Sequence, residues 1–279
     1  MKKLIDFDEL FDRKLAQYME EHAGEYTEKQ WEDLIPRLYR NFGDTLIKSV
    51  GTTPKGYYAE MTDEELVDTL KAHHKEGVSV SDFLCRELES RGCPDALLAL
   101  MQEAEGELLT LTINLAGSSK KALPVYLDIL LKTEDEELKD TVTEYLKGNA
   151  DAVKERVLAL YREGVEREYM LEILSRCKQK DDEVFEILLN EFRTAPDDIP
   201  MHASYLASYG DERALPVLLD YIDRDETNYL EYQELKYAIE ALGGEYNKVR
   251  DFSDDPYFQE IAAQSQIMPD FTSDKKTDA

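Results

Sequence analysis

Apolar residues recur three and four positions apart along most of the chain, in runs of about 10 to 15 residues, which is the spacing of one helix face. In segment 181–193 the residues that share a face are Phe185, Leu188, Leu189 and Phe192. We expect the side chain of Asp181 or Asp182 to cap this helix by accepting hydrogen bonds from the exposed N–H groups of its first turn. Alternating strand patterns and Asn-Gly or Asp-Gly hairpin turns do not occur in the sequence. The pattern therefore predicts an all-α protein.

One stretch of the sequence occurs twice. Segment 121–128 reads Lys-Ala-Leu-Pro-Val-Tyr-Leu-Asp and segment 213–220 reads Arg-Ala-Leu-Pro-Val-Leu-Leu-Asp. Predicted helix starts recur about every 26 to 32 residues, near Thr62, Pro94, Lys120, Ala150, Asp181 and Glu212. Each unit has room for two helices, and such a pair must stack on its neighbours to bury its apolar face. We predict an α-solenoid of antiparallel helix pairs with about six repeats.

The last unit begins Gly-Asp-Glu-Arg-Ala-Leu-Pro-Val-Leu-Leu-Asp at 210–220 and closes Ala-Ile-Glu-Ala-Leu-Gly at 238–243. These two stretches resemble the short HEAT-like repeat that is also found in phycobilin lyases. The resemblance implies an α-α superhelix of stacked helix pairs. Small alanines let helices approach one another, and Gly243 suits the left-handed position that ends a helix.

Three regions follow from these patterns. Residues 1–58 hold two helical patterns, 7–21 and 27–42, and a Gly- and Pro-rich linker, so we expect an N-terminal helical cap. In that linker Tyr57 and Tyr58 either tuck back as a lid or dock a ligand. Residues 59–244 form the repeat stack. Residues 245–279 form a polar C-terminal extension with a short helix at 256–264 and an end, 273–279, that we expect to be disordered.

The chain is strongly acidic, with 61 Asp and Glu against 33 Lys and Arg and a formal net charge of -28. Such a field repels phosphate backbones and steers basic proteins or peptides, although it also serves simply to keep a surface hydrated. We therefore expect no direct nucleic-acid binding. The three cysteines form no CxxC pair, and there is no signal-like or membrane-length apolar run. We predict a cytoplasmic protein outside the membrane.

No catalytic motif stands out. The chain has no GxSxG, P-loop or Rossmann fingerprint, and His73 and His74 are adjacent, so they point about 100° apart on a helix. Some HEAT-like proteins are deoxyhypusine hydroxylases that hold iron with His-Glu dipeptides, and no such dipeptide occurs here. Another branch excises alkylated bases with a basic face, which the net charge disfavours. We expect a protein that is not an enzyme.

The most specific local motif is segment 223–235, which fits the spacing of an EF-hand loop. Side-chain oxygens fall at Asp223, Asp225, Thr227, Glu231 and Glu234, and Tyr229 offers a backbone carbonyl. Asn228 stands where the sharp turn prefers glycine, and no second loop accompanies this one. The alternatives are a calcium-binding module and an acidic turn between helices without a specific metal. Apart from this Ca²⁺ we expect no cofactor.

Seventeen tyrosines are many for this length. Six fall on predicted second helices, which the HEAT resemblance places on a concave face: Tyr145, Tyr169, Tyr205, Tyr209, Tyr232 and Tyr237. They either anchor a partner or pack between helices. Our leading hypothesis is a non-enzymatic scaffold that binds a basic or mixed-charge protein segment on an acidic, tyrosine-bearing face. The alternatives are the calcium module and an acidic mimic of nucleic acid.

Overall fold

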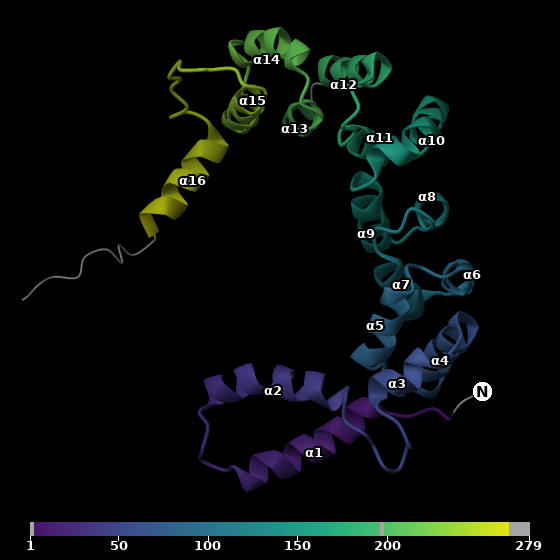
Figure 1. Ribbon diagram of the computed structural model, residues 1–279. Coiled ribbons are helices and arrows are strands. Elements are labelled where there is room, and N and C mark those ends of the chain that lie inside the picture. The colour runs from purple at the N-terminus through teal and green to yellow at the C-terminus, as the bar shows by residue number, and fades with distance from the viewer. Residues whose placement is uncertain (1–2, 196–197, 268–279) are drawn as a thin grey trace, which may run out of the picture. The chain divides into compact units, whose positions relative to one another are not determined.

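The computed structural model describes residues 3–195 and 198–267 of the chain, and all its regular elements there are helical (Figure 1). This confirms the all-α prediction. The helices are α1 (Phe7–Glu21), α2 (Glu28–Phe42), α3 (Pro54–Ala59), α4 (Asp63–Glu76), α5 (Asp82–Ser90), α6 (Asp95–Glu103), α7 (Gly106–Ala116), α8 (Leu123–Lys132), α9 (Glu136–Lys147), α10 (Ala150–Glu163), α11 (Arg167–Leu174), α12 (Asp182–Thr194), α13 (Ile199–Tyr209), the 3-10 turn η2 (Glu212–Ala214), α14 (Leu215–Ile222), α15 (Tyr229–Ala241) and α16 (Pro256–Ile267).

The helices begin where local capping chemistry favours a start. Thr62 caps α4, and its backbone N–H donates to the Glu65 carboxylate in a capping box. Asp181 caps α12 by accepting from the N–H groups of Glu183 and Val184. These short-range interactions depend only on neighbouring residues, which is why the sequence pattern located the starts closely.

The duplicated sequence has the same local structure in both places. Ala122 and Ala214 precede α8 and α14 with helical backbone angles, φ -81° and ψ -19° in one and φ -74° and ψ -23° in the other. Pro124 and Pro216 then occupy the first turn, where a missing N–H costs nothing because it has no partner within the helix. The repeated residues therefore start a helix in the same way twice.

The predicted linker contains a helix instead of a lid. Thr53 caps α3 by accepting from the Gly56 N–H at 3.0 Å, and Pro54 is the first helical residue. Tyr57 and Tyr58 are buried, and both rings meet the Phe7 ring edge-on with centroids 5.6 Å apart. They belong to the core beside α1.

The chain divides into two compact units, the first ending at Leu146 and the second beginning at Lys147. In the first unit α4 packs on α5 and α6, and α6 packs on α7 and α8. In the second unit the neighbours in sequence, α10 and α11, α12 and α13, and α14 and α15, form contacting pairs, and α13 also contacts α11 and α15. The borders expected at 58 and 244 stay a prediction.

The residues after α15 lie against the last helix pair. Gly243 has φ +81°, the left-handed conformation expected for it. The Tyr246 hydroxyl then donates to Asp223 at 2.7 Å, and Arg250 donates to the Arg224 carbonyl at 2.6 Å. Segment 256–264 is helical as predicted, within α16, while 273–279 lies outside the described residues. Among the helices that the structure describes, none has both the length and the apolar character needed to cross a membrane.

Candidate interaction surface

Three of the six singled-out tyrosines serve packing inside the units. Tyr209 and Tyr232 are buried, and the Tyr232 hydroxyl donates to the Lys248 carbonyl at 2.9 Å. Tyr145 is half-buried, stacks on Tyr126 at 5.4 Å and donates to the Asn114 side chain at 3.3 Å. These rings contribute apolar area to the fold and use their hydroxyls within it.

The other three tyrosines reach the surface of the second unit. Tyr169 on α11 and Tyr205 on α13 are half-buried, and Tyr237 on α15 is 63% exposed. Of these, Tyr205 has the most distinctive surroundings. Its ring meets the buried His202 ring at 5.8 Å in a T-shaped contact.

Tyr205 lies within electrostatic reach of three carboxylates. Burial, together with the nearby charges of Glu172, Glu168 and Asp198, raises the pKa of its hydroxyl to about 12. Glu168 and Asp198 are exposed, whereas Glu172 accepts from the Lys147 ammonium at 2.6 Å. We call the set Glu168, Glu172, Asp198, His202 and Tyr205 the Tyr205 cluster. It combines an amphipathic ring with excess negative charge, a combination suited to a cationic ligand.

A partly buried ionic network joins Glu191, Tyr161 and Arg167. Glu191 on α12 is 8% exposed and accepts from the Tyr161 hydroxyl at 2.6 Å. The Arg167 guanidinium pairs with the same carboxylate and covers the Tyr161 ring at 4.7 Å from its centroid. Burial raises the pKa of Glu191, but hydrogen bonds from Arg167 and Tyr161 outweigh it, so the pKa lies below its ordinary value. Glu191 is therefore ionised at neutral pH and already has its partners.

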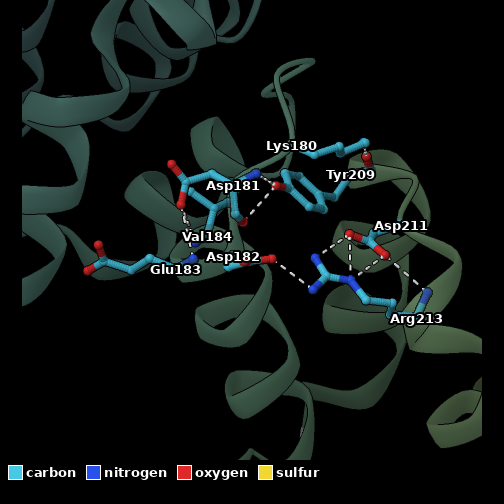
Figure 2. A network of polar contacts seen from close by, with 8 residues as sticks. All are labelled: Lys180, Asp181, Asp182, Glu183, Val184, Tyr209, Asp211 and Arg213. Carbon is cyan, nitrogen blue, oxygen red and sulfur yellow. Dashed lines mark hydrogen bonds and ion pairs between the residues drawn. The ribbon is translucent and has the colours of Figure 1, made fainter.

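Helices α12 and α13 are held together at their ends. Figure 2 shows the Tyr209 hydroxyl, at the end of α13, beside the backbone of Asp181 at the start of α12. The Asp181 N–H donates to this hydroxyl at 2.7 Å, and the hydroxyl donates to the Asp181 carbonyl at 3.0 Å. Lys180 lies over the Tyr209 ring, 4.3 Å from its centroid. These contacts fix the start of α12 to the end of α13.

An arginine joins this helix pair to the next one (Figure 2). Arg213 donates to Asp211 at 2.7 Å and to Asp182, in the first turn of α12, at 2.8 Å. Its guanidinium also lies over the Phe185 ring, 4.2 Å from the centroid. In the other copy of the duplicated sequence, Lys121 lies 3.4 Å from Asp95 in the first turn of α6. The basic residue that opens each copy thus reaches back to an acid in an earlier helix start.

The EF-hand-like residues have other partners in this structure. Asn228 caps α15 in a capping box with Glu231, so the helix begins at Tyr229, in the middle of the predicted loop. The buried Thr227 hydroxyl donates to the Tyr221 carbonyl at 2.9 Å, and Asp223 pairs with Lys248. Among the described residues, no group of three or more His, Cys, Asp or Glu side chains is placed to hold a metal ion.

The sequence interpretation missed His202, Glu168 and Asp198. A signal existed for the first, because His202 lies three positions before Tyr205 and shares its helix face. The carboxylates carried no comparable signal among so many acids. Comparison with models of known protein families, with curated proteins and with solved structures finds no match to the chain.

Proposed function

We propose that the protein is a non-enzymatic, cytoplasmic scaffold that binds a basic segment of another protein at the Tyr205 cluster. The observation that carries this proposal is the position of Tyr205, whose hydroxyl lies in the field of Glu172, Glu168 and Asp198. Two of these carboxylates are exposed. A lysine or arginine of a partner gains charge pairing there and apolar contact with the ring.

The overall charge supports the same kind of partner. A net charge of -28 gives a long-range field that accelerates encounter with basic proteins and repels nucleic acid. The net charge attracts a basic partner from a distance, and the Tyr205 cluster adds a local site in which carboxylates accompany a partly buried aromatic ring. Aromatic residues of this kind are frequent at the centres of protein interfaces.

We also propose that the helix pairs of residues 59–244 stack as a HEAT-like α-solenoid of about six repeats behind an N-terminal cap. Within each unit, consecutive pairs contact one another, which is the neighbour relation of a solenoid. The bridges from Arg213 to Asp182 and from Lys121 to Asp95 support a repeated geometry, since the same residue of the duplicated sequence makes both.

The test uses a fluorescently labelled 12-residue peptide of alternating lysine or arginine with glycine and serine, followed by anisotropy at low and moderate salt. We expect saturable binding that weakens with salt. The double substitution Glu168→Gln and Asp198→Asn should weaken binding about tenfold, since two partly screened charges contribute about 1.4 kcal/mol together. An acidic peptide of equal length should not bind.

The matched control carries the same change of charge elsewhere in the second unit. Glu163 on α10 and Glu186 on α12 are exposed, so Glu163→Gln with Glu186→Gln changes the global field equally but leaves the cluster intact. If both double variants lose the same affinity, binding is a property of the net charge and the proposed site is wrong. If no basic peptide binds at low salt, the proposed function is wrong.

A further inference from the structure

Helices α1 and α2 form a hairpin whose apolar side is only partly covered (Figure 1). At its base, where α1 begins and α2 ends, ring contacts reach α3 and α5. In α2, which the structure describes in full, Phe42 alone is buried. Five more apolar or aromatic side chains of this helix are half-buried: Trp31, Leu34, Ile35, Leu38 and Tyr39. An amphipathic helix normally turns such a stripe toward a core, so the hairpin has an incomplete apolar layer.

This incomplete layer contains a groove between the two helices. The groove has a volume of about 220 Å³. Its apolar lining comes from both helices and consists of Phe11, Leu15, Tyr18, Leu38 and Phe42. Beyond this lining, Leu46 follows α2 with 61% of its side chain exposed. A surface of this kind covers the apolar side of an added helix, as in complexes where a helix binds in a groove.

The charge beside the groove is positive, although the chain as a whole is acidic. Lys14 is the one charged side chain among the described residues that line the groove, and its ammonium lies 5.3 Å from the centroid of the Phe42 ring. Arg37 lies one turn before Asn41, which lines the groove from α2. Both cations are exposed, and within the described part of the chain neither forms an ion pair. The groove is therefore complementary to a ligand with negative charge.

We propose that this groove binds an acidic amphipathic helix of another protein, which covers Leu15 and Leu38 and pairs its carboxylates with Lys14 and Arg37. Helices α1 and α2 have 15 residues each, so a bound helix of three to four turns, about 22 Å, matches their length. A symmetric second copy would place Lys14 and Arg37 of both chains at one interface, which like charges disfavour. The hairpin belongs to the first unit, so this site does not depend on the function proposed for the Tyr205 cluster.

Trp31 provides the measurement, because it is the one tryptophan of the chain. Its ring meets Tyr18, which lines the groove, with centroids 6.2 Å apart. The full chain is titrated with tryptophan-free peptides of about 18 residues that carry one leucine stripe with glutamate or lysine flanks, and with a scrambled glutamate peptide. At about 0.15 M salt the screening length is about 8 Å, so local charges outweigh the net charge. We expect a saturable shift of Trp31 emission, about tenfold tighter binding of the glutamate-flanked peptide, and no binding of the scrambled one.

Charge-reversal variants assign this preference to named residues. Lys14→Glu with Arg37→Glu changes two exposed side chains and should make the lysine-flanked peptide the tighter ligand by about tenfold. Lys29→Glu with Arg40→Glu is the matched control, because both residues are exposed on the side of α2 opposite Leu38. This control should keep the preference of the parent protein. Leu38→Ala should weaken binding of the glutamate-flanked peptide about tenfold through lost apolar contact.

Three results would overturn the proposal. If no peptide shifts Trp31 emission saturably, or if the scrambled peptide binds as well as the amphipathic one, the groove does not bind a helix. If the preference for glutamate flanks is absent, or survives Lys14→Glu with Arg37→Glu, the proposed acidic partner is wrong. If sedimentation shows a dimer that Leu38→Ala dissociates, a second copy covers the groove instead. None of these results concerns the Tyr205 cluster, so the function proposed for that cluster is tested separately.

Discussion

Replacing Tyr209 with phenylalanine tests how helices α12 and α13 are held together. Tyr209 is 1% exposed, and its hydroxyl both accepts from the Asp181 N–H at 2.7 Å and donates to the Asp181 carbonyl at 3.0 Å. The carbonyl keeps a second partner, the Phe185 N–H at 3.0 Å, whereas the acceptor of the Asp181 N–H is the Tyr209 hydroxyl. Tyr209→Phe therefore leaves mainly one amide without a partner.

An orphaned amide of this kind costs about 1–3 kcal/mol, so we expect Tyr209→Phe to destabilise the second unit by about 2 kcal/mol. Hydrogen-exchange mass spectrometry on a peptide covering residues 178–186 measures this locally. About 2 kcal/mol corresponds to roughly thirtyfold faster exchange where opening limits it. The contact joins α12 to α13, so protection should fall in both helices.

Tyr237→Phe is the matched control, because Tyr237 is 63% exposed on α15. This control should change stability by no more than about 0.5 kcal/mol, the usual range for surface positions. Equal exchange rates in Tyr209→Phe and the parent protein would refute the reasoning, since they would show that the Asp181 amide finds another partner at no cost.

Three further predictions concern one buried charge and the ends of two helices. Arg167→Met removes the cation beside buried Glu191 and should destabilise the protein by about 1–3 kcal/mol at pH 7, less than a fully buried pair because Arg167 is 51% exposed. The pKa of Glu191 is lower in the folded state, so the stabilisation from its charge is present above the unfolded pKa and is lost as the pH falls through the folded pKa. Urea unfolding should therefore show a smaller difference in unfolding free energy between the parent protein and Arg167→Met near pH 4 than at pH 7. An equal difference at both pH values contradicts this. Gly243→Ala places a side chain on a residue with φ +81° and should lower the free energy of unfolding by about 1 kcal/mol, although nothing lies within 4 Å of the added carbon. Thermal unfolding measures this, and an unchanged melting temperature rejects the prediction. Arg250→Met removes the donors to the Ile222 and Arg224 carbonyls at the end of α14. A loss of about 1 kcal/mol of hydrogen-bond energy predicts amide exchange about fivefold faster in residues 222–226. Unchanged exchange in these residues argues that Arg250 does not stabilise the end of α14.

The sequence predicted the parts of the fold that depend on neighbouring residues. The caps at Thr62 and Asp181 lie within a few positions of the groups they bind, so their helix starts could be read directly. The helix at α3 was missed because its Gly- and Pro-rich composition is typical of a linker, although Thr53 and Pro54 form a favourable helix start. In this segment the favourable helix start at Thr53 and Pro54 determined the structure, and the Gly- and Pro-rich composition did not.

The site could not be predicted in the same way because its contacts are non-local. Glu191 meets Tyr161 and Arg167 from positions 30 and 24 residues away, and no periodicity reports such pairs. For the calcium-site prediction a competing signal was present, since Asn228 and Glu231 have the spacing of a capping box. That box starts a helix inside the segment that an EF-hand would keep as a loop.

The most direct test of the central proposal is a hydrogen-exchange footprint of the full chain with and without the 12-residue basic peptide at saturation. The account predicts added protection in α11 and around the start of α13, where Glu168, Asp198, His202 and Tyr205 lie, with little change in α1 and α2. The Glu163→Gln variant should show the same footprint, and Glu168→Gln with Asp198→Asn should show a weaker one. Protection confined to other helices, with α11 and α13 unchanged at saturation, would contradict the account.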